Sequence, residues 1–559
     1  MQSDNGIPRL SKIGSTWQLL VDEKPYLILG GQVQNSSFNS AEYMKPIWGK
    51  LTKMGINTVI GPVAWEDIEP EEGSFQFSDL DAIMADARSH GLRLILLWFG
   101  SFKNGMSTYV PSWVKKDASR FPRVQIESAQ NVLRTVEVIS VFHQQCVEAD
   151  GKAFAALMRH LKESDLQRTV IMVQVENECG IIGDSRDRSY LAEAAFQAPV
   201  PPQLIDFLVQ NWSTLHADFT RSFPAFCLER MSRPANDWKG CFGQSARTDE
   251  LFMAHHYALY IEKIAAVGKE QYPLPHYINA WLPKPDDTPK TEGLAAGGHK
   301  PGVYPSGGAT NNMLDIWEQF APSVDFIAPD IYTADYTETC MVYGSRKYPF
   351  FVPEQRRDSF GARRITKAIG SFRAIGVAPF GVDTIKVEDC AFSKLYRLLG
   401  SVSNAILAAQ TRPNAIFGFF FDQYSPPADK SHPRITKQFA AYELVISRAF
   451  VLGQPGTGSG IIIELDPSRF LIVGMGFKVE FKSLSAASRF TGILTCMEKR
   501  VIDAERGVLE SVRKLNGDET KGGTWCNMPN EVPDYGDQFI PMCIPAGTMI
   551  TEVEVYSLG

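Results

Sequence analysis

The stretch "VQVENECG" at residues 173–180 places two carboxylates and an amide directly after an apolar run that begins at Thr169. Side chains alternate along a strand, so Glu176 and Glu178 share one face of a regular strand while Asn177 faces the other way. A bulge or a turn must therefore re-aim one of the two glutamates. Glu178 lies nearest to the rim on which the strand would end.

Three other acids, Asp330, Glu354 and Asp422, also follow apolar runs. Two carboxylates that meet on one rim suit glycosidic cleavage, in which one is a protonated acid and the other an ionised nucleophile or base. Retention of configuration requires carboxyls about 5 Å apart, and inversion requires about 6.5–9.5 Å. Glu178 and Glu354 are 354 − 178 = 176 residues apart, so only the fold can bring them together.

Eight short apolar runs recur in the chain, and they have the pattern of strands that are covered on both faces. Helical patterns separate them, for example after Ser40, over 78–90 and over about 136–162. The eight units predict an α/β fold, a (β/α)8 (TIM) barrel. A doubly wound open sheet is the alternative, but no Gly-rich phosphate turn follows the first run. The runs are 26–30, 56–60, 92–98, the stretch from 169 described above, 276–281, 325–332, 348–357 and 415–425.

The chain divides into two parts by its patterns. Residues 1–450 form the predicted barrel, with a long Gly/Pro-rich insertion near 282–312 that we expect to fold over the barrel mouth. Residues 451–559 show strand and turn patterns without a long helix, which predicts a small all-β, sandwich-like C-terminal domain.

Composition narrows the class of protein and its partners. Hydrophobic residues make up 44% and charged residues 21%, as in soluble globular proteins. A net charge of −7 without a basic run argues against nucleic acid as a partner. No apolar run is long enough to cross a membrane, and no signal peptide is recognised. We expect a cytoplasmic protein, or a secreted or periplasmic one if a signal was removed; a homodimer stays open.

Metal and cofactor chemistry has no support in the sequence. The nine histidines are dispersed, without a ligand pair such as H-x-x-x-H. The nine cysteines show neither C-x-x-C nor a zinc-like spacing. No cofactor-binding motif is found, so we expect neither a metal nor a cofactor.

Four stretches together resemble glycoside hydrolase family 35, the β-galactosidases among the clan-A (β/α)8 enzymes. "IMVQVENECG" resembles the family's QVENE-(Y)-G motif, and "WEDIEPEEGSFQFSDLDA" at 65–82 resembles its segment after strand two. "FVPEQRRDS" resembles the nucleophile segment of a branch that carries a small β-rich C-terminal domain, and residues 30–37 match that branch after strand one. These stretches span residues 30–359 and thus the whole predicted barrel.

The resemblance implies a retaining double displacement with Glu178 as acid/base and Glu354 as nucleophile. It also implies that Asn177 hydrogen-bonds the 2-hydroxyl of the sugar and that Tyr332 donates to the nucleophile. Apolar neighbours such as Val175 are expected to raise the pKa of Glu178. Further candidates for holding the substrate are Asn104, Gln34, Asn35, Trp65 and Trp281.

We therefore predict a retaining exo-β-galactosidase that removes terminal β-galactose from oligosaccharides or plant cell-wall glycans. One alternative keeps the fold and mechanism but changes the sugar, as in a β-glucosidase, a β-xylosidase or an endo-β-glycanase. Another is a non-catalytic carbohydrate-binding protein. The chain departs from the family at Gln34 and Cys179, where many members have His and Tyr, and these departures bear on the choice of sugar.

Overall fold

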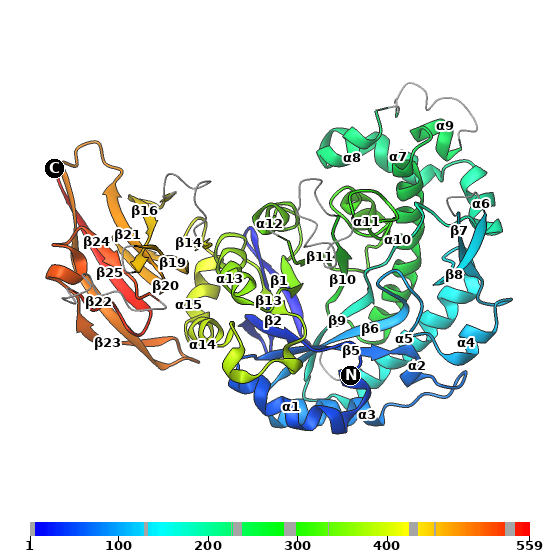
Figure 1. Cartoon of the computed structure of the whole chain (residues 1–559), viewed down its shortest axis with the longest axis horizontal. Coiled ribbons are helices and arrows are strands. Elements are labelled where there is room, and N and C mark those ends of the chain that lie inside the picture. Colours follow the sequence, from blue (N-terminus) through cyan, green and yellow to red (C-terminus); the bar gives the residue numbers. More distant parts are fainter. Residues whose placement is uncertain are drawn as a thin grey trace.

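The computed structural model describes residues 6–127, 132–224, 226, 237–283, 298–333, 335–423, 434–451, 454–530 and 543–559. Eight parallel strands close into a barrel that is surrounded by helices (Figure 1), which confirms the predicted (β/α)8 fold. In barrel order, the strands are β4 (Ile28–Gln32), β5 (Thr58–Ala64), β6 (Arg93–Lys103), β9 (Val170–Asn177), β10 (His276–Trp281), β11 (Phe326–Ile331), β12 (Phe351–Gln355) and β13 (Gly376–Pro379).

The helices cover the outside of the barrel, so the strands are buried on both faces and carry few polar residues. The first helix shows how the sequence builds this layer. Ser40 caps it by accepting from the backbone N–H of Tyr43, and its apolar positions at helical spacing are buried against the barrel. The helices are α1 (Ala41–Lys53), α2 (Trp65–Ile68), α3 (Ser78–Ser89), α4 (Ser112–Lys116), α5 (Gln144–Ser164), α6 (Tyr190–Gln197), α7 (Pro202–Asn211), α8 (Ala217–Ser222), α9 (Trp238–Phe242), α10 (Ala246–Gln271), α11 (Leu314–Phe320), α12 (Tyr336–Gly344), α13 (Ser359–Ser371), α14 (Ser393–Ser401) and α15 (Ser403–Gln410).

The eighth barrel strand is β13, so its prediction at 415–425 was wrong. That run forms β14 (Ile416–Phe421), which pairs antiparallel with β19 (Gly458–Asp466) in a C-terminal sheet. β14 is apolar on both faces because Gly418 packs against helix α13, while Phe419 enters a separate C-terminal core. A buried pattern on both faces therefore identified a strand but not its sheet.

Asp422, which follows β14, is consequently not a rim acid. Its carboxylate forms ion pairs with Arg363 and Arg364 of α13, at N···O distances of 3.4 and 2.5 Å. A second correction concerns the helix predicted over about 136–162. Residues Leu133–Ile139 form strand β8, paired with β7 (Arg123–Glu127), and helix α5 begins only at Gln144.

The C-terminal part consists of a six-stranded sheet, β14-β19-β20-β25-β22-β23, and a four-stranded sheet, β15-β16-β21-β24. A core that includes Phe419, Phe470 and Phe477 fills the space between them. This all-β part begins at Ile416, earlier than the boundary at 450 drawn from the sequence. Its strands are β15 (Ile435–Gln438), β16 (Tyr442–Arg448), β17 (Phe450–Val451), β18 (Gln454–Pro455), β19, β20 (Arg469–Met475), β21 (Phe477–Ser483), β22 (Phe490–Asp503), β23 (Val508–Lys514), β24 (Trp525–Asn527) and β25 (Ile550–Leu558).

The six-stranded sheet is joined to the barrel by an apolar interface. Ile461, Ile463 and Leu471 belong to the same buried cluster as the barrel core, and α13, α14 and α15 lie between barrel and sheet (Figure 1). At the other end of the chain, a small antiparallel sheet precedes the barrel, with strands β1 (Arg9–Ile13), β2 (Thr16–Val21) and β3 (Lys24–Tyr26). None of the described helices is long and apolar enough to cross a membrane. Of the predicted insertion at 282–312, residues 284–297 lie outside the described part.

Candidate active site

The end of β9 separates the two glutamates of the opening motif. Glu176 and Glu178 both have positive φ angles, +61° and +48°, and the pairing of β6 with β9 shifts register between Trp98 and Lys103. Glu176 turns toward β6, where its carboxylate accepts hydrogen bonds from the backbone N–H groups of Ser101 (3.0 Å) and Phe102 (2.6 Å). The predicted irregularity is thus present, and it leaves Glu178 to face the barrel mouth.

Three buried carboxylates meet at this mouth. Glu178 of the β9 end, Asp330 of β11 and Glu354 of β12 each offer an oxygen within 4.8 Å of the other two. Their exposed fractions are only 7%, 4% and 9%. Asp330 and Glu354 are register partners on adjacent strands, while β10 and β11 separate Glu178 from Glu354 around the barrel. The fold therefore brings together the two glutamates that the sequence paired across 176 residues.

Two neutral donors hold Glu354 in place. The Tyr332 hydroxyl donates to Oε1, as the family resemblance implied, and Gln32 Nε2 donates to Oε2 at 2.8 Å. Gln32 was not recognised from the sequence, although it lies within the quoted segment 30–37. The signal was its place as the last residue of β4, on the rim where all barrel strands end.

The surroundings of Glu178 favour its protonated form. Burial raises its pKa to about 7, the nearby ammonium of Lys103 opposes this rise, and the charge of Glu354 adds to it. Burial and then the charge of Glu354 also raise the pKa of Asp330 well above its usual range. Asn279 connects the Glu178 backbone to the Asp330 carboxyl, since it accepts from the Glu178 backbone N–H (2.9 Å) and donates to Asp330 (2.6 Å). Burial thus favours a protonated carboxyl at both Glu178 and Asp330.

Lys103 is a second residue that the sequence did not single out. Its ammonium is buried and donates to the side-chain oxygens of Asn177, at 3.0 Å, and of Asn104. The Asn177 Nδ2 finds no acceptor among the described residues although it is buried. Because Lys103 occupies the oxygen of this amide, the free NH2 group is the part left for a ligand.

The remaining predicted contacts divide into two groups. Asn104 is exposed beside Lys103, the half-buried Gln34 and Asn35 lie in the turn after β4, and Trp281 ends β10 in register with Asp330. These four lie at the carboxyl ends of barrel strands. Trp65 also follows a barrel strand, β5, but it is a correction because its side chain is fully buried: its indole N–H donates to Glu69 at 2.8 Å, and its ring packs edge-on against Trp113.

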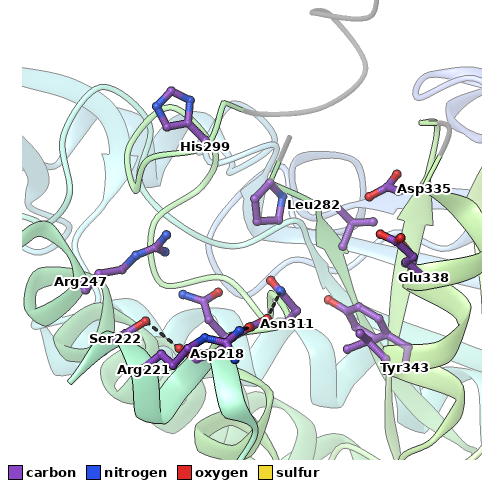
Figure 2. Close-up of a pocket in the computed structure, with 14 residues that line it drawn as sticks. Asp218, Arg221, Ser222, Arg247, Leu282, His299, Asn311, Asp335, Glu338 and Tyr343 are labelled. Atoms are coloured by element: carbon purple, nitrogen blue, oxygen red, sulfur yellow. Dashed lines mark hydrogen bonds and ion pairs between the residues drawn. The ribbon is translucent and has the colours of Figure 1, made fainter. Parts of the chain in front are cut away.

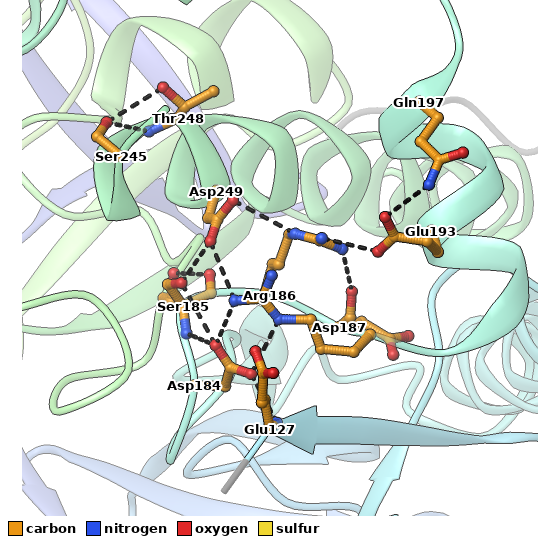
Figure 3. A network of polar contacts seen from close by, with 12 residues as sticks. Glu127, Asp184, Ser185, Arg186, Asp187, Glu193, Gln197, Ser245, Thr248 and Asp249 are labelled. Atoms are coloured by element: carbon orange, nitrogen blue, oxygen red, sulfur yellow. Dashed lines mark hydrogen bonds and ion pairs between the residues drawn. The ribbon is translucent and has the colours of Figure 1, made fainter. Parts of the chain in front are cut away.

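A polar network fixes the loop that follows Glu178 (Figure 3). Arg186 is 3% exposed; its guanidinium pairs with Glu193 and Asp249 at 2.7 and 3.3 Å and lies 4.0 Å from the Phe196 ring. Asp184 accepts from Arg188 and from the Glu127 backbone N–H. These contacts tie the loop to α10 and the β7–β8 hairpin, so the backbone beyond Glu178 is supported from both sides.

The three carboxyls are close enough to hold a divalent cation. Their existing partners favour another use, however. Tyr332, Gln32 and Asn279 already donate hydrogen bonds to two of them, and Lys103 supplies a positive charge nearby. Such donors suit a site in which carboxylates exchange protons or attack carbon.

Residues 39–217 match a glycoside hydrolase family 42 model described as "Beta-galactosidase", and residues 392–527 match one described as "Domain of unknown function (DUF5597)". The chain is 30% identical over 186 residues to the β-galactosidase of Xanthomonas manihotis, which covers 32% of this chain and 27% of that protein. It is 32% identical over 172 residues to human β-galactosidase-1-like protein 3, covering 30% and 23%. These matches span about a quarter of the length of the curated relatives.

Among solved structures, the chain is similar to the β-galactosidase of Bacillus circulans sp. alkalophilus, with a TM-score of 0.44 and 15% identity over 70% of this chain and 58% of the other. It is also similar to the β-amylase catalytic domain of Paenibacillus polymyxa, with a TM-score of 0.42 and 13% identity over 65% and 94%. The family match covers β5, β6 and β9 of the barrel and includes Glu178. The resemblance to β-galactosidases is confirmed over the part of the barrel that the family match covers.

Proposed function

We propose that the chain is a retaining, exo-acting β-galactosidase. The observation that carries the proposal is the approach of Glu178 and Glu354, each of which offers one carboxyl oxygen within 4.8 Å of the other's. This approach is closer to the roughly 5–5.5 Å separation of retaining enzymes than to the 6.5–9.5 Å of inverting ones. Their low exposure suits a pocket that encloses one terminal sugar, and similarity to β-galactosidases supports galactose as that sugar.

In the first step, Glu354 attacks the anomeric carbon while Glu178 gives its proton to the glycosidic oxygen. The bond between that carbon and oxygen breaks, the alcohol leaves, and the galactosyl group is joined to Glu354 with inverted configuration. Tyr332 and Gln32 hold the attacking carboxylate in one orientation. The free NH2 group of Asn177 is placed to meet the 2-hydroxyl, a contact that strengthens in the transition state.

In the second step, Glu178 acts as a base. It takes a proton from a water molecule that attacks the same anomeric carbon, Glu354 leaves, and β-galactose is released. A pKa of about 7 allows Glu178 to perform both tasks near neutral pH, because it loses and regains one proton in each cycle.

The test is a panel of nitrophenyl β-glycosides, with the released sugar followed by NMR during early turnover. Release of β-galactose, faster than glucose or xylose, is expected. Azide distinguishes the acid/base from the nucleophile. In Glu178→Ala, azide should react with the glycosyl-enzyme and give β-galactosyl azide. In Glu354→Ala, azide should replace the missing nucleophile and give α-galactosyl azide. Early release of α-galactose would exclude retention, and an unimpaired rate in Glu354→Gln would exclude the proposal.

A second candidate keeps the chemistry and changes the sugar. Gln34 and Cys179 differ from the residues of many family members, and the half-buried Gln34 lies on the same rim as Glu354. A β-glucosidase or β-xylosidase would reverse the order of rates in the same panel.

A further inference from the structure

The core between the two C-terminal sheets encloses two thiols, those of Cys496 and Cys526, which are 2% and 0% exposed. This core is apolar, in contrast to the polar cavity of the barrel part that Figure 2 shows, whose lining includes Asp218, Arg247 and Glu338. None of the described residues that line that cavity is a cysteine. Because the two thiols are shielded from reagents in solution, their immediate neighbours decide what chemistry they can undergo.

The two cysteines come from opposite sheets. Cys496 lies on β22 of the six-stranded sheet, where Val553 of β25 is its register partner. Cys526 is the middle residue of β24 in the four-stranded sheet, where Val479 of β21 is its partner. On both strands, the residues before and after the cysteine are more exposed than the cysteine itself. Because side chains alternate along a strand, both thiols point into the space between the sheets.

Two contacts between the sheets hold these segments together on either side of the cysteines. On one side, the backbone N–H of Ile493 donates to the Gly523 carbonyl at 3.0 Å, and each of these residues lies three positions before a cysteine. On the other side, the Thr551 hydroxyl donates to the Met528 sulfur at 3.5 Å. Met528 lies two positions after one cysteine, and Thr551 is the register partner of Glu498, two positions after the other. The pair is therefore framed by contacts that fix the distance between its two segments.

The two thiols are in contact. A hydrogen bond between them, followed by burial, raises the pKa of Cys526 well above its usual range. The Cys526 thiol also donates to the Met528 sulfur at 4.0 Å. A disulfide places the two Cβ atoms about 3.5–4.5 Å apart, and side chains whose thiols already meet need only a rotation and a small approach to reach that geometry. One disulfide between the sheets can thus form with the strands kept in register.

We propose that Cys496 and Cys526 form an oxidative modification site: in the presence of a disulfide oxidant, they are joined in a disulfide that ties the two C-terminal sheets together. The bond closes a loop of 526 − 496 = 30 residues and thereby restricts the unfolded chain. Such oxidants act in secretory compartments and in the periplasm, whereas cytoplasmic thiols are kept reduced. The inference goes beyond the proposed activity and does not depend on it.

The reaction is a thiol–disulfide exchange with a small disulfide such as oxidised glutathione. One cysteine thiolate attacks a sulfur of the oxidant, the S–S bond of the oxidant breaks, and one glutathione leaves. The second cysteine then attacks the protein sulfur of this mixed disulfide, which forms the bond between the cysteines and releases the second glutathione. The two protein sulfurs lose two electrons, which reduce the oxidant, and their two protons end on the two glutathione thiols. Because both cysteines are enclosed in the finished core, the exchange takes place while the sheets assemble.

The experiment makes the full chain by cell-free synthesis in two buffers, one with reduced and oxidised glutathione and one with dithiothreitol. The soluble product is denatured in the presence of an alkylating reagent, and mass spectrometry counts the alkylated cysteines. The chain has nine cysteines, so the product made with dithiothreitol should carry nine alkyl groups. The product made with glutathione should carry 9 − 2 = 7, and its non-reducing digest should contain Cys496 and Cys526 in one linked pair of peptides.

Single substitutions locate the bond. Cys496→Ala and Cys526→Ala each leave 9 − 1 = 8 cysteines, and all of them should be alkylated in both buffers. The matched control is Cys340→Ala, which removes a completely buried cysteine of α12 in the barrel. In the glutathione buffer, this control should carry 8 − 2 = 6 alkyl groups because its cross-link is intact.

The cross-link should also stabilise the sheets. Proteolysis at rising temperature should cut β22 and β24 at a temperature about 5–10 °C higher in the oxidised wild type than in the reduced one, and Cys526→Ala should show no such difference. An oxidised chain that was cut at the temperature of the reduced chain would refute the claim that the bond ties the sheets together.

Nine alkyl groups in the wild-type product made with glutathione would overturn the inference. A linked peptide that joined Cys543 to either cysteine would also overturn it, because the contact in the core would then not direct the pairing. None of these outcomes bears on the galactosidase proposal, which the substrate panel tests separately.

Discussion

Two clusters of buried carboxylates lie at the end of β9, one around Glu176 and the other around Glu178, and their surroundings differ. In the first, Glu176 accepts from the backbone N–H groups of Ser101 and Phe102, and Asp150 accepts from Trp98 Nε1 (2.8 Å) and Ser101 Oγ (2.5 Å). Both carboxyls are completely buried. Every oxygen of this pair therefore has a donor from the protein itself.

The second cluster, Glu178 with Asp330 and Glu354, keeps part of its hydrogen-bonding capacity open. Burial raises the pKa of Glu178 and of Asp330, the Asn177 Nδ2 beside them lacks an acceptor among the described residues, and each carboxyl retains some exposure. The comparison teaches that residue type does not separate a structural carboxylate from a reactive one. The supply of fixed donors does, because a fully satisfied group has nothing left for a ligand.

The largest expected effect follows from replacing one carboxyl by an amide in each cluster. Glu354→Gln should lower kcat by at least about 10³-fold, since an amide cannot act as the nucleophile. Glu176→Gln should keep kcat within about tenfold, because its side chain faces β6 rather than the sugar. Steady-state rates on a β-galactoside decide the matter, and equal losses in the two variants would refute the distinction.

The next effect concerns stability and its dependence on pH. Glu178 has a pKa of about 7 in the folded chain against 4.5 for the free side chain, so the folded state binds its proton more tightly. Between pH 4.5 and 7, rising pH therefore lowers the free energy of unfolding, and above 7 the full cost of about 3 kcal/mol is present.

Glu178→Gln removes this cost. At pH 8 the variant should be more stable than the wild type by up to about 3 kcal/mol, and at pH 4 the difference should disappear. Urea unfolding at the two pH values measures it. A pH-independent difference would show that Glu178 is not held protonated by burial.

A smaller effect on stability is expected when the cluster of Glu176 and Asp150 loses one hydrogen bond. Glu176→Gln retains the shape of the side chain but replaces one acceptor oxygen by an NH2 group, so one backbone N–H of Ser101 or Phe102 loses its partner. A buried unsatisfied donor costs about 1–3 kcal/mol. Because burial also raises the pKa of Glu176 above the 4.5 of the free side chain, the loss should show in urea unfolding at pH 4, where the carboxyl is protonated in both states. Unchanged stability would mean that the donors at Ser101 and Phe102 find other partners.

The barrel was largely predictable because burial on both faces leaves a strong local signal in seven of its strands. β13 was missed since its four residues, Gly376–Pro379, form too short a run of small side chains. β14 took its place because α13 on one side and Phe-rich packing on the other give it the same pattern. Apolar periodicity reports burial, and it carries no information about which sheet provides it.

The site was predictable where a motif carried it and not elsewhere. Glu178, Glu354 and Tyr332 lie where the family resemblance implied. Gln32 and Lys103 each act through one or two hydrogen bonds from another strand, and such contacts leave no periodic trace in a sequence. Trp65 shows the converse, since an aromatic residue in a segment that carried the family resemblance belongs to the core.

The smallest expected effect concerns Lys103 and its influence on the pKa of Glu178. Lys103 lies between them, and its charge lowers the pKa of Glu178. Lys103→Met should therefore raise that pKa and move the alkaline limb of the kcat/KM profile to higher pH by up to about one unit. The same change releases the Asn177 oxygen, so KM should rise as the amide loses its fixed orientation. Lys103→Arg, which keeps the charge, should restore the limb but not the 3.0 Å contact. If the limb stayed in place in Lys103→Met, this lysine would only support Asn177, and burial with the charge of Glu354 would determine the pKa of Glu178.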